Sequence, residues 1–188
     1  MPWEKSFDTN DALDAAMHVF WAKGYEETSM SDLIEAMGIN KGSLYNAYGD
    51  KKTLFILVLK KYGQERSQAF LDELKQIDDP KTAITNFFDC AIDSAQCDKE
   101  QKGCLLVNTS LKLASFDDDI QEIVKQGIEE VETFFQTCLK QMGMSTKEAK
   151  DKAKLLMAIT VGLKVISRGA FDADSLNAVK RQALQIIS

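Results

Sequence analysis

Proline is scarce in this chain, since Pro2 and Pro80 are the only two among 188 residues. Because proline breaks helix interiors, residues 3–79 and 81–188 contain no obligatory break. Both stretches are rich in alanine, leucine, lysine, glutamate and glutamine, which favour helix. Sustained alternation of apolar and polar residues, typical of strands, is also missing. The composition therefore predicts an all-α fold.

Histidine is scarcer still, because His18 is the single one. A zinc site built from several histidines of one chain is excluded, and a catalytic triad would depend on this residue alone. The sequence contains four cysteines but no Cys-x-x-Cys pair and no phosphate-binding loop. We therefore expect no metal, no cofactor and no enzymatic activity.

Long apolar runs are absent too. The nearest approach to the roughly 18 residues of a membrane helix is 155–166, which Lys164 interrupts. The N-terminal residues lack the apolar core of a signal peptide. The sequence predicts a cytoplasmic protein without membrane contact, in which the cysteines are free thiols.

Positive charge is in short supply overall, with 23 basic against 29 acidic residues and a net charge of −6. This balance excludes a protein covered in basic charge for nucleic acid. However, residues 38–61 hold five lysines and one acidic residue, a net charge of +4, which leaves −10 for the other 164 residues. A local basic patch is therefore predicted.

Apolar residues at helical spacing, with capping residues and glycines at the ends, predict about nine helices. Ser29 with Asp32 fits a capping box, and Asp79 before Pro80 is a strong start signal. The predicted helices cover residues 8–23, 31–37, 41–48, 51–76, 80–98, 104–114, 117–142, 145–169 and 172–187.

Residues 24–54 have the spacing of a helix-turn-helix, because two short helices are separated by Gly38-Ile39-Asn40. Gly38 can adopt the positive φ that such a tight turn requires. The second helix offers lysine, serine, tyrosine and asparagine, which are residue types that contact phosphates and base edges. The alternative is that residues 41–52 form a solvated connection between two helices.

The order and spacing of several short segments resemble the DNA-binding domain of the TetR family of bacterial transcriptional regulators, over residues 8–58. The matching segments are Gly24-Tyr25, Thr28-Ser29-Met30-Ser31-Asp32-Leu33, Gly38-Ile39-Asn40-Lys41-Gly42-Ser43-Leu44-Tyr45-Asn46-Ala47-Tyr48, Lys51 and Leu54-Phe55. The resemblance implies a three-helix DNA-binding domain over residues 1–50. It also implies an effector-binding and dimerisation domain over residues 51–188, which begins with a long linking helix.

The same resemblance implies roles for the recognition helix. Lys41 and Gly42 open this helix where side chain and backbone meet DNA. Ser43, Tyr45 and Asn46 are expected on its groove-facing side.

The family resemblance also implies roles for four residues outside the groove-facing side of the recognition helix. Thr28 and Ser29 match positions that cap the second helix and touch backbone phosphate. Tyr48 matches a packing aromatic whose hydroxyl can reach a phosphate, and Lys51 matches a phosphate-contacting lysine.

The start of the first helix departs from the family pattern. Many relatives carry basic residues there, whereas this chain has Asp8, Asp11 and Asp14. A basic N-terminal phosphate anchor is therefore not expected, and DNA binding should be either weakened by this low charge or helped by Lys52 and Lys60.

An apolar set in the second domain has two interpretations. Phe88, Phe134, Phe135 and Met157 either form core or line a cavity for a small apolar effector.

The last two predicted helices carry more apolar surface than one core requires, and the resemblance implies that they form a homodimer. Such a dimer would bind a palindromic operator with two recognition helices. The interface residues expected are Leu156, Ile159, Leu163, Leu176, Val179 and Leu184.

Residues 102–108 resemble a segment in the TetR subgroup that includes the N-ethylmaleimide-responsive repressor. The resemblance implies that Cys104 senses electrophiles or oxidants, with Lys102 two residues away. The alternative is that Cys104 packs as a small buried hydrophobe.

The sequence thus predicts a homodimeric repressor that a small-molecule effector releases from its operator. The alternatives are a thiol-based sensor acting through Cys104, a helical interaction module and a small helical enzyme.

Overall fold

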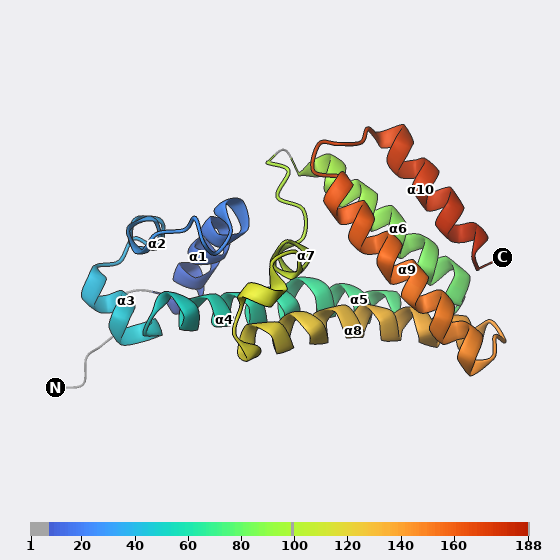
Figure 1. The fold of residues 1–188 in the computed structure, drawn as a ribbon, viewed down its shortest axis with the longest axis horizontal. Coiled ribbons are helices and arrows are strands. Elements are labelled where there is room, and N and C mark those ends of the chain that lie inside the picture. The colour runs from blue at the N-terminus through green and yellow to red at the C-terminus, as the bar shows by residue number, and fades with distance from the viewer. Residues whose placement is uncertain (1–7, 99, 188) are drawn as a thin grey trace.

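The computed structural model describes residues 8–98 and 100–187 of the chain. These residues form α-helices, one π-helical segment (η1) and one 3₁₀ turn (η2), and they contain no strand (Figure 1). In chain order the elements are α1 (Thr9–Lys23), α2 (Met30–Met37), α3 (Lys41–Tyr48), α4 (Lys51–Tyr62), η1 (Gly63–Gln68), α5 (Ala69–Leu74), α6 (Pro80–Cys97), α7 (Leu105–Ser110), η2 (Leu113–Ser115), α8 (Asp118–Gln141), α9 (Thr146–Ile166) and α10 (Ala173–Gln185).

The predicted all-α fold is confirmed. Because α4, η1 and α5 follow one another without a gap, they form one long helix, and the ten α-helices of the described residues make nine helical units. Two details differ from the sequence prediction. The long helix contains the π-helical segment at its middle, and the helix predicted over residues 104–114 ends at Ser110 and continues as a 3₁₀ turn.

Side-chain caps fix where many of these helices begin. The capping box predicted at α2 is present, since Ser29 accepts from the Asp32 amide while Asp32 accepts from the Ser29 amide. The carboxylate of Asp50 accepts from the Thr53 amide at 2.7 Å, and that of Asp79 accepts from the Thr82 amide at 2.9 Å. Capping is a local interaction, which is why the sequence located these helix starts well.

Acid is expected to weaken the fold through these caps. Hydrogen bonds from Thr53 and Thr82 lower the pKa of Asp50 and of Asp79 below the ordinary value of 3.8. A carboxylate with a lowered folded-state pKa stabilises the fold above its unfolded pKa, and this contribution is lost as the pH falls through the folded value. We expect the urea midpoint, followed by circular dichroism, to fall below about pH 4.

The matched pair of variants is Asp79→Asn at the cap and Asp78→Asn one residue before it. The Asp79→Asn protein should lose less stability between pH 5 and pH 3 than the Asp78→Asn protein. Equal losses in both variants would contradict a role for the caps in acid sensitivity.

The first hydrophobic core joins α1, α2, α3 and α4 to part of the second domain. Phe20, Leu44 and Phe55 of α1, α3 and α4 are at most 1% exposed. Residues of α7 and of the first half of α8, including Leu105 and Ile120, complete the same core. The boundary predicted at residue 50 falls between α3 and α4, and one hydrophobic core contains residues from both sides of it.

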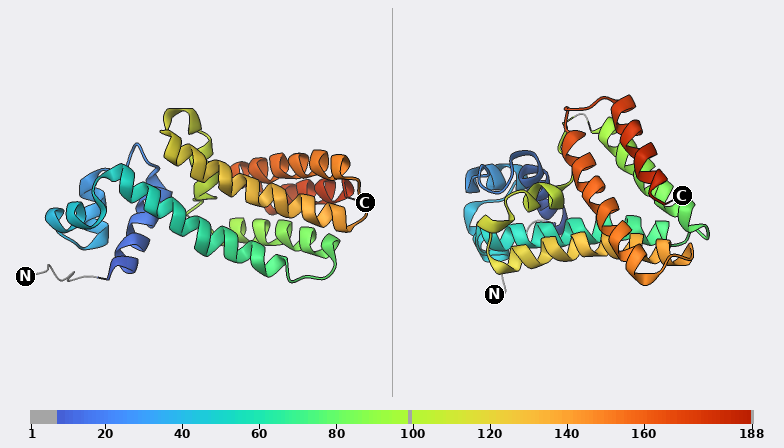
Figure 2. Two further views of the ribbon diagram at one scale, coloured as in Figure 1. Left: turned by 90° about the horizontal axis from the view of Figure 1, so that it is seen from below. Right: turned by 45° about the vertical axis from the view of Figure 1, so that its right-hand side comes forward.

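The second core lies at the opposite end of the molecule, among α5, α6, α8, α9 and α10. Figures 1 and 2 show α8 running beside the long α4–α5 helix, from the small helices at one end toward α6 and α9 at the other. Because α8 contributes residues to both cores, it connects them. No helix among the described residues is long and apolar enough to span a membrane.

Candidate nucleic-acid interface

The helix-turn-helix is built by a glycine turn and an asparagine cap. Gly38 ends α2 in the left-handed region with a φ of 63°. Asn40 then caps α3, because its Oδ1 atom accepts from the Ser43 amide at 2.8 Å. This role of Asn40 was not predicted, although an asparagine directly before a helix is itself a capping signal.

One side of α3 faces solvent. Lys41, Gly42, Tyr45 and Asn46 are exposed there, as expected for a surface that enters a DNA groove, and Tyr45 is 44% exposed. The Lys41 ammonium lies 5.9 Å from the centre of the Tyr45 ring. A Cβ atom at Gly42 would lie 3.3 Å from the capping oxygen of Asn40, so glycine keeps the start of α3 uncrowded.

The groove-facing position predicted for Ser43 needs correction, and so does the phosphate contact of the Tyr48 hydroxyl, whereas Tyr48 packs in the core as predicted. Ser43 is only 4% exposed, because it lies with Leu44 on the buried side of α3. It therefore does not belong to the groove-facing side. Tyr48 is 7% exposed, and its hydroxyl donates to the Thr9 carbonyl at 3.0 Å. Tyr48 therefore ties α3 to the start of α1.

The two residues before α2 also differ from each other. Thr28 is 1% exposed and its hydroxyl donates to the Gly24 carbonyl at 2.6 Å, so the predicted phosphate contact is replaced by a structural one. Ser29 is exposed at the N-cap of α2. The neighbouring Asp32 carboxylate also accepts from Lys23 at 2.8 Å, and these hydrogen bonds hold the pKa of Asp32 well below its usual range.

Lys51 begins α4 at the edge of this surface. Its ammonium lies 4.5 Å from the centre of the Tyr25 ring and donates to the Glu26 carbonyl at 3.4 Å. No described carboxylate forms an ion pair with Lys51, so its charge is available to a phosphate.

The basic patch is smaller than the sequence indicates. Lys52 forms an ion pair with Asp117 at 2.6 Å, and Lys61 forms one with Glu65 at 2.6 Å. The Asp117 contact raises the pKa of Lys52, and this lysine joins the first turn of α4 to the start of α8. The Lys52 ammonium, which was expected to assist DNA binding, is therefore engaged in an ion pair within the chain.

Two family models match the chain. Residues 12–58 match the model for bacterial regulatory proteins of the tetR family. Residues 80–182 match the C-terminal domain of LmrA/YxaF-like transcriptional regulators, which covers more than half of the chain. The chain belongs to the TetR family. The expected order of a DNA-binding domain followed by a TetR-type second domain is confirmed.

Individual TetR-family relatives agree with this assignment. An uncharacterised HTH-type regulator of Bacillus subtilis, YezE, is 30% identical over 131 residues, or 70% of this chain and 68% of YezE. The Escherichia coli repressor ComR is 32% identical over 126 residues, or 64% of this chain and 58% of ComR. A cysteine mutant of the TetR-family regulator CifR, solved with double-strand operator DNA, is 25% identical with a TM-score of 0.82, and the match covers 96% of this chain and 97% of that chain.

Three of the residues predicted to line an effector cavity, Phe88, Phe134 and Phe135, lie in the second core. Phe88 and Phe135 are fully buried, and Phe134 and Met157 are 3% and 7% exposed. The Phe135 ring lies 4.8 Å from that of Phe87 and 5.6 Å from that of Phe134, centre to centre. These rings pack against one another and fill the interior.

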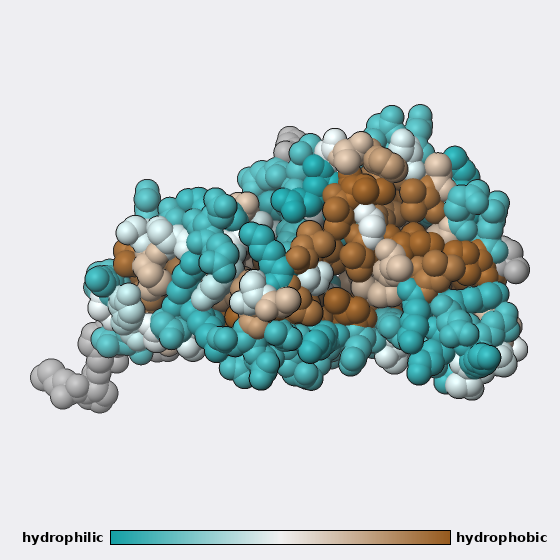
Figure 3. Space-filling view, viewed as in Figure 1, coloured by the Kyte–Doolittle hydropathy of each residue, from teal (hydrophilic) through white to brown (hydrophobic). Residues whose placement is uncertain are grey.

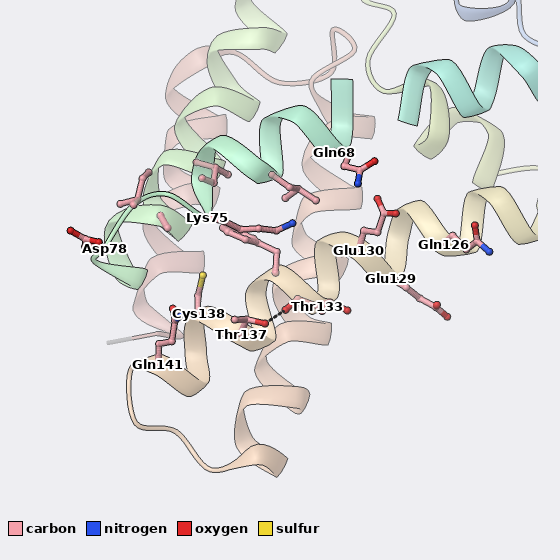
Figure 4. A pocket seen from close by; sticks show the side chains of 15 residues that line it. Gln68, Lys75, Asp78, Gln126, Glu129, Glu130, Thr133, Thr137, Cys138 and Gln141 are labelled. Carbon is pink, nitrogen blue, oxygen red and sulfur yellow. Dashed lines mark hydrogen bonds between the residues drawn. The ribbon is translucent and has the colours of Figure 1, made fainter. Parts of the chain in front are cut away.

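A groove of about 760 Å³ lies instead between α5 and α8. Its floor contains buried apolar side chains such as Leu71, Leu74 and Phe134. Figure 4 shows Lys75 from one wall and Glu130 from the other directed toward this space. Among the four residues predicted to line an effector cavity, Phe134 alone lines the groove.

Cys104 occupies a partly buried position between the two cores. It is the residue directly before α7 rather than a member of its first turn. Its neighbours include Tyr62 and Lys164. Burial raises the pKa of Tyr62, with Cys104 adding to the effect, while burial lowers the pKa of the Lys164 ammonium.

The dimer residues predicted from the sequence divide into two groups. Leu156, Leu163 and Leu176 are at most 3% exposed inside a single chain, so they belong to the chain's own core and not to a surface that a second copy could touch. Ile159, Val179 and Leu184 are only partly buried. Leu155, which lies on α9 like Ile159, is 48% exposed. Figure 3 shows a broad hydrophobic area over α9 and beside α10.

Proposed function

We propose that this TetR-family regulator is a homodimeric repressor that binds a palindromic operator through α3. A small-molecule effector that binds the second domain releases it. The observation that carries the proposal is the exposed face of α3, where Lys41, Tyr45 and Asn46 point outward on a helix whose other side is buried. These side chains supply a phosphate contact and hydrogen bonds to base edges.

Dimerisation through α9 and α10 fits the apolar surface that a single chain leaves uncovered. Leu155, Ile159 and Val179 would be buried against a second copy, since isolated chains rarely expose broad apolar areas. The proposal places the protein in the cytoplasm, where its DNA is, and assigns it no catalytic role.

Footprinting on the DNA that flanks the protein's own gene tests the proposal. We expect two protected half-sites, related by two-fold symmetry and separated by whole turns of DNA. Sedimentation of the free protein should give the mass of a dimer. A monomer in solution, or the absence of a protected site at low salt, would overturn the proposal and favour an interaction module.

A second candidate for release is chemical modification of Cys104. The observation that favours it is the position of this thiol beside Tyr62 and Lys164, between the DNA-binding end and the second core. A bulky adduct there would disturb packing that both domains share. Cysteine reacts as the thiolate, so the reaction with an electrophile should accelerate as the pH rises.

The test measures operator binding by the native protein and by the Cys104→Ser variant, each before and after treatment with N-ethylmaleimide. If Cys104 is the sensor, the reagent should release the native protein and leave the serine variant bound. Cys97→Ser is the matched control, because Cys97 is an exposed thiol at the end of α6. Release of both variants by the reagent would reject Cys104 as the sensor.

A further inference from the structure

The lysine at the start of α4 is held by an aromatic ring of the loop between α1 and α2. The Lys51 ammonium lies 4.5 Å from the centre of the Tyr25 ring, within the distance of a cation–π interaction. A second contact, to the Glu26 carbonyl at 3.4 Å, restrains the same ammonium. Both partners belong to the loop between α1 and α2, so this loop determines where the Lys51 charge lies.

Tyr25 is in turn held by three other rings, one of which is Phe20 of α1, stacked at 6.2 Å. Its ring lies 4.9 Å from that of Phe55 in α4 and 5.4 Å from that of Phe116, which packs edge-on against it. Phe116 belongs to the second domain and lies two residues before α8, whose N-cap is Asp117. The ring of Phe116 also stacks on Phe55 at 5.9 Å. One aromatic cluster therefore connects the start of α8 to Lys51.

The start of α8 is fixed at this place by a separate contact. Asp117 follows Phe116 and forms the ion pair with Lys52 at 2.6 Å. Burial raises the pKa of Tyr25, so its ring stays neutral and the contact with Lys51 is not an ion pair. The other half of α8 carries Phe134 and Glu130, which line the groove. A shift of α8 at the groove would therefore move Phe116.

We propose that Tyr25 is a positioning residue for operator binding, which holds the Lys51 ammonium toward the DNA backbone, and that Phe116 makes this position depend on the second domain. This inference rests on the proposed function and adds a route by which an effector weakens DNA binding. In the bound state the ammonium contacts a phosphate while its opposite side remains on the Tyr25 ring. The ring thus reduces the freedom that Lys51 loses on binding.

A double-mutant cycle tests the proposal, with operator affinity measured by fluorescence anisotropy. Tyr25→Leu should weaken binding by about 5- to 30-fold, since the ring that holds Lys51 is then missing from each subunit. Tyr25→Phe keeps the ring and should restore near-native affinity. In a Lys51→Gln background, Tyr25→Leu should have little further effect. Phe116→Leu should act in the same direction as Tyr25→Leu, more weakly, and should also lose its effect in that background.

Several results would overturn the proposal. One is equal weakening by Tyr25→Leu with and without Lys51, which would indicate a general packing role. Unchanged binding by the Tyr25→Leu variant would mean that the ring does not position Lys51, and tighter binding would mean that the ring competes with DNA for the ammonium. Melting temperatures of all variants identify any that fail to fold, in which case Tyr25→Met replaces Tyr25→Leu. Failure of the proposed function would show differently, because the native protein would then bind no operator. A failed cycle on an operator that the native protein does bind would overturn only the role of Tyr25.

Discussion

Replacing Phe135 by alanine is expected to lower the free energy of unfolding by about 3–5 kcal/mol. Phe135 is fully buried, and its ring lies within 6 Å of the rings of Phe87, Phe88 and Phe134. Removing it leaves a cavity among rings that cannot all move inward, so reduced burial and poorer packing both contribute. For a chain of this length the melting temperature should fall by roughly 6–20 °C.

The matched control is Phe171→Ala, the same substitution at a position that is 46% exposed. Urea denaturation followed by circular dichroism should place this control within about 0.5 kcal/mol of the native protein. The comparison also decides between the two interpretations of the aromatic set. A loss below about 1 kcal/mol for Phe135→Ala would indicate that the ring lines a cavity rather than filling the core.

Replacing Tyr45 by alanine is expected to weaken binding to the operator by about 1–3 kcal/mol for each base that the tyrosine touches. Tyr45 is the large side chain on the exposed face of α3, and its removal should leave the fold intact. Affinity for DNA of unrelated sequence should change little, because that affinity comes mainly from phosphate contacts. The measurement is a pair of anisotropy titrations, on the operator and on a scrambled duplex.

Tyr48→Phe is the control on the same helix. Its buried hydroxyl donates to the Thr9 carbonyl, so the variant should lose about 1 kcal/mol of stability and keep its preference for the operator. If Tyr45→Ala kept the full preference, or if Tyr48→Phe lost it, the exposed face of α3 would not be the surface that reads the sequence.

The sequence predicted features that depend on neighbouring residues. The helix starts at Ser29 and Asp79 and the turn at Gly38 follow from local hydrogen bonds and backbone preferences, and the structure confirms all three. The exposed positions of Lys41 and Tyr45 agree with the recognition helix that the family resemblance implies.

Side-chain partners that are distant in the sequence could not be predicted. Lys52 counts as a free cation until α8 brings Asp117 to within 2.6 Å of it, across 65 residues of chain. Tyr48 likewise looks available for phosphate until the start of α1 supplies a carbonyl for its hydroxyl. Leu156 and Leu163 look like dimer residues because an apolar stripe does not reveal which helix covers it.

The salt dependence of operator binding tests the central claim most directly, which is that an acidic protein binds DNA through a small basic surface. Lys41, Lys51 and Lys60 remain outside the ion pairs of the described residues, giving six such lysines in a dimer. If each contacts a phosphate, a plot of log affinity against log salt concentration should have a slope of about −5. A slope near zero between 50 and 200 mM salt would contradict DNA binding through these lysines.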